Sequence, residues 1–216
     1  MEVPIKKVSF PNRAAFVKAT HASAVRAGLS PESANLLVAH IAASTKWGEK
    51  IDNYRVAGMK AGEVYRKSHP YTAVGGCECL PARPNQIDPA CTCPPGKGQR
   101  YFKKLYWRAY NSLDEGVAAM VRQLQVEKYA QAWAYLQAVD PEYFAEVGRQ
   151  GWYNADPAYL KRMMSGHLLK IAAITGVGGA KVASVGASGS GGSGGAIAVG
   201  LGIPAALAIG FLIWKG

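Results

Sequence analysis

The sequence predicts a mainly α domain with a small β-hairpin lobe, followed by a C-terminal transmembrane helix. Apolar residues at helical spacing, with helix-start signals before them, occur up to residue 48 and again after residue 110. Between residues 51 and 100, Gly, Pro and Tyr dominate and helical periodicity stops, which is typical of loops and a short hairpin. From Val182 to Trp214 there is no charged residue and no histidine, so the globular part ends before this segment.

Local capping signals mark the helices of the predicted domain. Asn12 and Ser30 are the expected N-caps of the first two helices, and the second has Pro31 in its first turn. Gly28 and Gly48 mark where these two helices end. Later helices are expected to start near Ser112, Tyr129, Asp140 and Asp156.

The C-terminal part divides into a tether and a membrane segment. We expect a domain over 1–165, a Gly/Ser/Ala-rich linker over 166–194 and a transmembrane helix over 195–214. The last segment has the length of about 20 apolar residues that a helix needs to cross a bilayer, and Trp214 and Lys215 follow the pattern of a membrane exit. A buried core helix is the less favoured alternative. Glycines in this tail would allow self-association.

The charge balance favours anionic partners. Lys and Arg number 25 against 14 Asp and Glu, a net charge of +11. Such a surface suits nucleic acid, anionic lipid or acidic wall polymers. No run of five basic residues occurs, so a solvated basic surface is favoured over a specific nucleic-acid site. The N-terminus shows no signal peptide, so delivery to a cell wall would need another route, such as a virus particle.

All four cysteines lie in the turn-rich middle, as Cys77-x-Cys79 and Cys91-x-Cys93. One antiparallel hairpin would place the four side chains on a single face and pair Cys77 with Cys93 and Cys79 with Cys91. Disulfides are favoured over zinc, because Cys-x-Cys pairs are less typical of zinc sites than Cys-x₂-Cys. No cofactor is expected apart from this zinc alternative.

Four segments in order carry a family resemblance: 42–48 (AASTKWG), 53–60 (NYRVAGMK), 107–116 (WRAYNSLDEG) and 151–157 (GWYNADP). Together they resemble the bacterial and phage peptidoglycan β-N-acetylglucosaminidases of the flagellar and autolysin type, over roughly residues 13–164. The resemblance implies a lysozyme-like fold, with a small β-lobe across a glycan cleft.

The chain departs from the family at the catalytic acid. The resemblance places the general acid at the end of the second helix, where this chain has Ser44. A serine hydroxyl is too weak an acid to protonate a glycosidic oxygen. Two other carboxylates are candidates: Glu49 is interpreted mainly as a solvated charge, and Glu78 is open between a retained β-lobe carboxylate and a surface charge.

The same resemblance implies a set of residues for glycan binding. They are Trp47, Asn53, Gly58, Lys60, Tyr110, Trp152 and Tyr153. Aromatic faces pack on sugar rings, although aromatics at helix ends more often belong to the core. We interpret Trp47 as core and Tyr153 as a cleft residue, and we interpret His21 and His40 as structural.

Three functions follow as hypotheses. The first is a phage-type, virion-associated protein that engages peptidoglycan strands without cutting them, inserts into a lipid bilayer and aids genome delivery, located in the virion or the host envelope membrane. The second is an active peptidoglycan hydrolase with a displaced acid. The third is a purely structural virion membrane protein, associated with itself or with other virion proteins.

Overall fold

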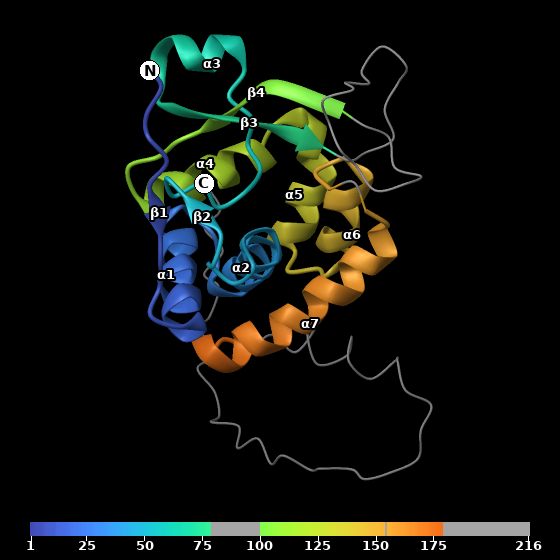
Figure 1. The fold of residues 1–216 in the computed structure, drawn as a ribbon. Coiled ribbons are helices and arrows are strands. Elements are labelled where there is room, and N and C mark those ends of the chain that lie inside the picture. Colours follow the sequence, from blue (N-terminus) through green and yellow to red (C-terminus); the bar gives the residue numbers. More distant parts are fainter. Residues whose placement is uncertain (79–99, 154, 179–216) are drawn as a thin grey trace, which may run out of the picture.

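A computed structural model describes residues 1–78, 100–153 and 155–178 (Figure 1). Over these residues the fold is mainly helical, with two small two-stranded antiparallel sheets. The helices are α1 (Arg13–Arg26), α2 (Pro31–Thr45), α3 (Glu63–Ser68), α4 (Leu113–Leu124), α5 (Ala130–Gln137), α6 (Glu142–Arg149) and α7 (Pro157–Thr175), with a 3₁₀ turn over Glu127–Tyr129. The strands are β1 (Lys7–Val8), β2 (Ile51–Asp52), β3 (Tyr71–Glu78) and β4 (Arg100–Arg108).

Helix α2 is the central element of the core. It packs against α1, α5 and α7, and in Figure 1 it lies between α1 and the α5–α6 pair, above α7. Leu36, Leu37 and Ile41 of α2 are fully buried. Burial of each such side chain contributes about 1.5–3 kcal/mol, so α2 is the rigid element from which a site at its C-terminal end is built.

The predicted helix starts are confirmed by their caps. The side chains of Asn12 and Ser30 accept hydrogen bonds from backbone N–H groups three residues later, at 2.9 and 3.1 Å. Ser112 and Asp156 cap α4 and α7 in the same way, at 3.2 and 2.7 Å. Each cap satisfies a donor that the helix itself cannot pair.

The described part of the middle of the chain holds more regular structure than its composition predicts. A hairpin is present as β3 and β4, although β4 begins only where the predicted loop-and-hairpin stretch ends. Helix α3 lies within the stretch that was predicted to hold only loops and a hairpin. Strand β1 pairs with β2, so residues near the N-terminus are hydrogen-bonded to the segment that follows α2. The helix was missed because α3 has only six residues and buries none of its side chains, which leaves no apolar periodicity to detect.

The register of the hairpin differs from the one predicted from the cysteines. Strand β3 places Cys77 opposite Tyr101, not opposite Cys93. The expectation that one ladder runs through both cysteine pairs is therefore wrong. Cys79, Cys91 and Cys93 lie outside the described residues, and the choice between disulfides and zinc stays a prediction.

The domain extends beyond the predicted boundary at residue 165. Helix α7 continues to Thr175, and Leu168 and Ile171 are buried in the core. Asn35 on α2 donates a hydrogen bond to the carbonyl of Val177 at 2.7 Å, which holds the end of this segment. Residue 165 therefore lies inside a packed helix. None of the described helices is both long and apolar enough to cross a membrane; the segment 195–214 lies outside the described residues, and its membrane span stays a prediction.

Candidate functional site

The four motif segments meet at the C-terminal end of α2. A pocket of about 120 Å³ is lined by Ser44 and Thr45 of the first segment, residues 55–58 of the second, Trp107 of the third, and Lys50. Tyr153 of the fourth segment is hydrogen-bonded to Ser44 through its hydroxyl group. We call this space the Ser44 pocket. Segments separated by up to about a hundred residues thus share one small site.

The end of α2 turns the chain sharply at this pocket. Lys46 and Trp47 both have positive φ, 51° and 60°, a conformation that non-glycine residues adopt rarely. The turn directs Trp47 away from Ser44. Its ring lies 4.8 Å from the ring of His167, and the Arg13 guanidinium lies 5.6 Å from the ring centre. Trp47 is therefore packed against the core, as predicted, and does not line the Ser44 pocket.

A second left-handed turn, over residues 52–55, leads into the pocket residue Arg55. The Arg55 N–H donates to the Asp52 carbonyl at 3.0 Å, and Asn53 and Tyr54 between them have φ of 50° and 52°. This is the geometry of a type I′ turn. A β-carbon on Gly116 would lie 2.0 Å from the Tyr54 carbonyl oxygen, so the turn packs directly on the backbone of α4. Left-handed non-glycine residues persist where packing holds them, and they gather at functional sites.

The Asn53 side chain binds the N-terminal segment to this turn through hydrogen bonds. Its side-chain oxygen accepts a hydrogen bond from the Lys6 N–H, and its amide donates to the Pro4 carbonyl, both at 3.0 Å. Its backbone carbonyl also accepts a bond from the Tyr110 N–H at 2.9 Å. The side chain that the resemblance assigns to glycan is thus occupied in holding the N-terminal segment.

The wall of the Ser44 pocket combines an aromatic ring with cations. The Arg55 guanidinium lies 4.7 Å from the centre of the Trp107 ring, a cation–π geometry. The Arg55 side chain is only 19% exposed and pairs loosely with Asp52, at 3.8 Å. Burial lowers the pKa of Arg55, although Asp52 opposes this shift. Lys50 adds a second positive charge, and no acidic side chain is among the lining residues that the structure describes.

Behind Ser44 lies a group that we call the buried polar cluster: His40, Ser44, Tyr143 and Tyr153. His40 is one helical turn before Ser44, and its Nδ1 is hydrogen-bonded to the Tyr143 hydroxyl at 2.7 Å. The Tyr153 hydroxyl also lies 3.4 Å from the His40 carbonyl. The His40 Nε2 is buried without a hydrogen-bond partner among the described residues. Trp152 packs its ring 5.2 Å from that of His40.

Burial keeps the cluster uncharged. It lowers the pKa of His40 to about 3 and raises the pKa of Tyr143 and Tyr153 well above the usual tyrosine range. At neutral pH the imidazole is therefore neutral and both phenols are protonated. A phenol with a raised pKa is a weaker acid than an ordinary tyrosine, so Tyr153 does not replace a carboxylic acid beside Ser44.

The remaining predicted site residues are dispersed. Glu49 is exposed and lines a separate pocket with Trp47 on the side of β1 and α1. Tyr110 lines a third, larger pocket. Gly58 lines the Ser44 pocket, whereas Lys60 is exposed and is not part of its lining. Glu78 pairs with Arg100 through the backbone of the hairpin, and its side chain lies outside the described residues.

Three residues of the Ser44 pocket that supply charge or an aromatic face were missed in the sequence: Lys50, Arg55 and Trp107. Arg55 and Trp107 both lie within the quoted motif segments, and their clustering with other motif residues was the available signal.

Among the described residues, no group of three or more His, Cys, Asp or Glu is arranged to hold a metal ion. No family model, curated protein or solved structure matches the chain.

Proposed function

We propose that the chain is a phage-type, virion-associated protein whose helical domain binds peptidoglycan strands without cleaving them. The observation that supports this proposal is that three motif segments line one pocket and the fourth contacts it through the bond of Tyr153 to Ser44, with no acid among the described lining residues. Hydrolysis of a glycosidic bond needs a carboxylic acid next to the leaving oxygen. The resemblance assigns that position to Ser44, whose hydroxyl is hydrogen-bonded to the Tyr153 hydroxyl.

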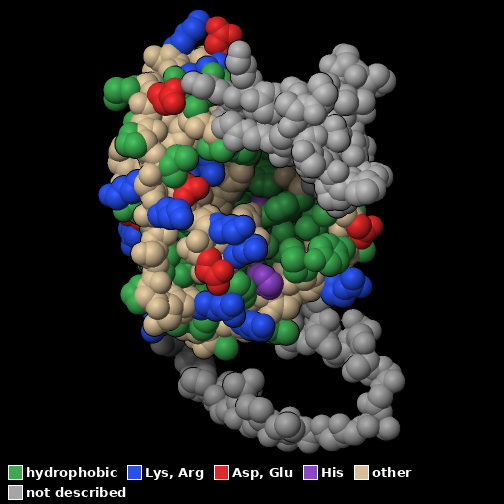
Figure 2. Space-filling view, viewed as in Figure 1, with side chains coloured by type: hydrophobic (Ala, Val, Ile, Leu, Met, Phe, Trp, Pro, Cys, Tyr) green, Lys and Arg blue, Asp and Glu red, His purple; other side chains and the backbone are tan. Residues whose placement is uncertain are grey.

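The pocket chemistry supports a wall glycan as the ligand. An aromatic ring such as that of Trp107 packs on a pyranose face, and Arg55 and Lys50 supply positive charge for anionic groups of the wall polymer. The wider surface is basic as well. On the face drawn in Figure 2, Lys and Arg side chains gather near the lower centre with few acidic side chains among them. Such a field attracts anionic wall polymers.

The same proposal includes membrane insertion by the uncharged segment 195–214, with a lysozyme-like domain on its N-terminal side. The support for both is the sequence pattern: the apolar run that ends in Trp214 and Lys215, and the four ordered motifs. A chain that engages the wall and then the bilayer suits delivery of a genome through an envelope.

The test is a paired binding and cleavage assay on purified peptidoglycan. The full chain in detergent micelles should sediment with peptidoglycan and release no reducing sugar. Trp107→Ala should weaken sedimentation roughly tenfold, as expected on removing an aromatic anchor. Tyr159→Ala, an exposed aromatic on α7 away from the pocket, is the matched control and should bind normally.

Two outcomes would contradict the proposal. Release of reducing sugar that is lost in Glu78→Gln or Glu49→Gln, and kept in Ser44→Ala, would establish a hydrolase with a displaced acid. Failure of the wild-type chain to bind peptidoglycan would favour a purely structural virion protein.

A further inference from the structure

The largest of the pockets that we describe lies on the other side of β4 from the Ser44 pocket. It has a volume of about 550 Å³ and is formed by α3, the end of β4 and α4. Trp107 and Arg108 are consecutive on β4, and successive side chains of a strand point to opposite faces. Accordingly Trp107 lines the Ser44 pocket and Arg108 lines this one. We call it the Arg122 pocket.

Two guanidinium groups lie at this pocket without a carboxylate partner among the described residues. Arg122 projects from α4, and neither an ion pair nor a side-chain hydrogen bond engages it in the part of the chain that the structure describes. Arg108 is positioned by its Nε, which donates to the Lys60 carbonyl at 3.3 Å, and by the Tyr65 ring, whose centre is 4.8 Å away. Among the described residues no carboxylate engages the terminal nitrogens of Arg108, which lie beside the Tyr110 hydroxyl and can turn to a planar acceptor.

Glu115, the single acid among the described lining residues, is already used by the fold. Glu115 accepts a hydrogen bond from the Asn111 N–H at 2.8 Å, in the cap that begins α4. The lining therefore carries two positive charges against one negative charge. This leaves a surplus of one, which matches a single carboxylate better than a phosphate dianion.

The walls of the pocket are suited to a short peptide. Tyr65 stacks on His69 with ring centres 4.5 Å apart, and Tyr110 belongs to the same lining. Burial raises the pKa of Tyr110 to about 12, while Arg108 and Arg122 act against that shift, so both cations lie near its hydroxyl. Small apolar residues, among them Ala109, Ala119 and Val126, complete the lining. The volume falls in the usual range for ligand sites.

We propose that the Arg122 pocket binds the carboxylate end of a short, small-residue peptide, with Arg108 and Arg122 holding the carboxylate and the tyrosine walls holding the chain. Arginine forks match the planar geometry of a carboxylate. This site is separate from the glycan site, and a peptide probe without sugar tests it independently of the proposed glycan binding.

The test is calorimetric titration of the full chain in detergent micelles with N-acetyl-Ala-Ala-Ala as its free acid and as its C-terminal amide. The acid should bind saturably, and the amide should bind at least about tenfold more weakly, because a charge-assisted pair is lost. Arg122→Gln should weaken binding of the acid by a similar factor. Arg162→Gln removes the same charge from an exposed position on α7 and should leave binding unchanged.

Equal binding of the acid and the amide, or an equal loss in Arg162→Gln, would overturn the proposal in favour of general charge attraction. Absence of saturable binding of the acid would also overturn it, as would tight binding of inorganic phosphate without binding of the peptide. Because Arg122 is exposed, its variant is expected to keep the wild-type circular dichroism spectrum.

Discussion

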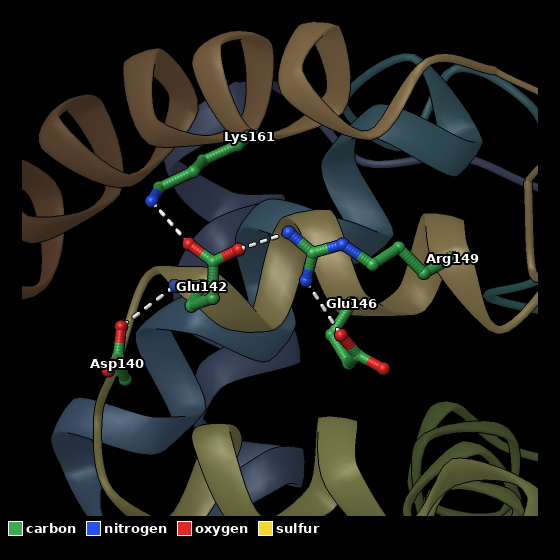
Figure 3. Close-up of polar contacts among 5 residues, drawn as sticks. All are labelled: Asp140, Glu142, Glu146, Arg149 and Lys161. Carbon is green, nitrogen blue, oxygen red and sulfur yellow. Dashed lines mark hydrogen bonds and ion pairs between the residues drawn. The ribbon is translucent and has the colours of Figure 1, made fainter.

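Helix α6 contributes neighbouring residues to two polar groups with opposite properties. Tyr143 belongs to the buried polar cluster with His40, whereas Glu142 belongs to a surface ion cluster with Arg149 and Lys161 (Figure 3). Figure 3 shows Lys161 of α7 and Arg149 of α6 reaching the Glu142 carboxylate from opposite sides. The first group has no charge to pair, and the second consists of paired charges.

The comparison shows that exposure to solvent decides whether these polar side chains are neutral or ionised. Burial dominates the shifts in the first cluster and keeps His40, Tyr143 and Tyr153 neutral. In the second, the hydrogen bonds from Lys161 and then Arg149 lower the pKa of Glu142 and keep it ionised. Water screens the surface cluster, so its contribution to stability is small. The buried cluster is unscreened, so a lost partner or an added charge there is costly.

The largest expected effect is the pH dependence of the buried histidine. Its folded pKa of about 3 is below the value of about 6.5 for an unfolded histidine. The unfolded chain therefore binds a proton first as the pH falls, and stability is lost between these two values. We expect the free energy of unfolding to fall by about 1.4 kcal/mol per pH unit from this group. Chemical unfolding followed by circular dichroism, between pH 7 and 4.5, measures it.

The control for this prediction is a pair of variants. His40→Gln should remove most of the slope. His167→Gln should remove less, because His167 is only partly buried, although burial also lowers its pKa. An unchanged slope in His40→Gln would show that this histidine is not the titrating group.

A smaller effect is expected from removing one hydroxyl of the cluster. Tyr143→Phe leaves the His40 Nδ1 without its partner, and Nε2 already has none among the described residues. Because an unsatisfied buried group costs free energy, we expect a loss of about 1–2 kcal/mol in unfolding by denaturant. Tyr129→Phe, at another buried tyrosine, is the matched control. If both variants lose the same free energy of unfolding, the hydrogen bond between Tyr143 and His40 contributes no more than an ordinary tyrosine hydroxyl, and the prediction is wrong.

The smallest effect is expected in the surface ion cluster. Glu142→Gln removes the charge between Lys161 and Arg149 and should cost about 0.5 kcal/mol at low salt, since such pairs are largely solvated. The loss should shrink further in 0.5 M NaCl because salt screens exposed charges. Glu146→Gln, which loses only the contact with Arg149, should cost less. A large, salt-independent loss in Glu142→Gln would mean that this cluster behaves like the buried one.

The sequence by itself determined where the main helices begin and the mainly helical class with a small hairpin. Caps such as Asn12 and Ser112 act on the backbone three residues away, so the interacting groups are adjacent in the chain and can be recognised from it. The motif segments were visible for the same reason, since each is short and continuous. The end of the domain was misplaced because burial of Leu168 and Ile171 depends on α2, far away in the sequence.

Only the tertiary structure decided which motif residues share a site. Ser44 and Tyr153 are brought together across 109 positions, whereas Trp47, three residues after Ser44, is turned to another face by two left-handed residues. Tyr110 was grouped with Tyr153 by sequence, yet it lines the Arg122 pocket. Side-chain direction depends on the backbone turn and on distant packing partners, and neither is encoded within a single short segment. For that reason the sequence located the motifs, and the packing of α1, α2, α4 and β4 divided their residues among three pockets.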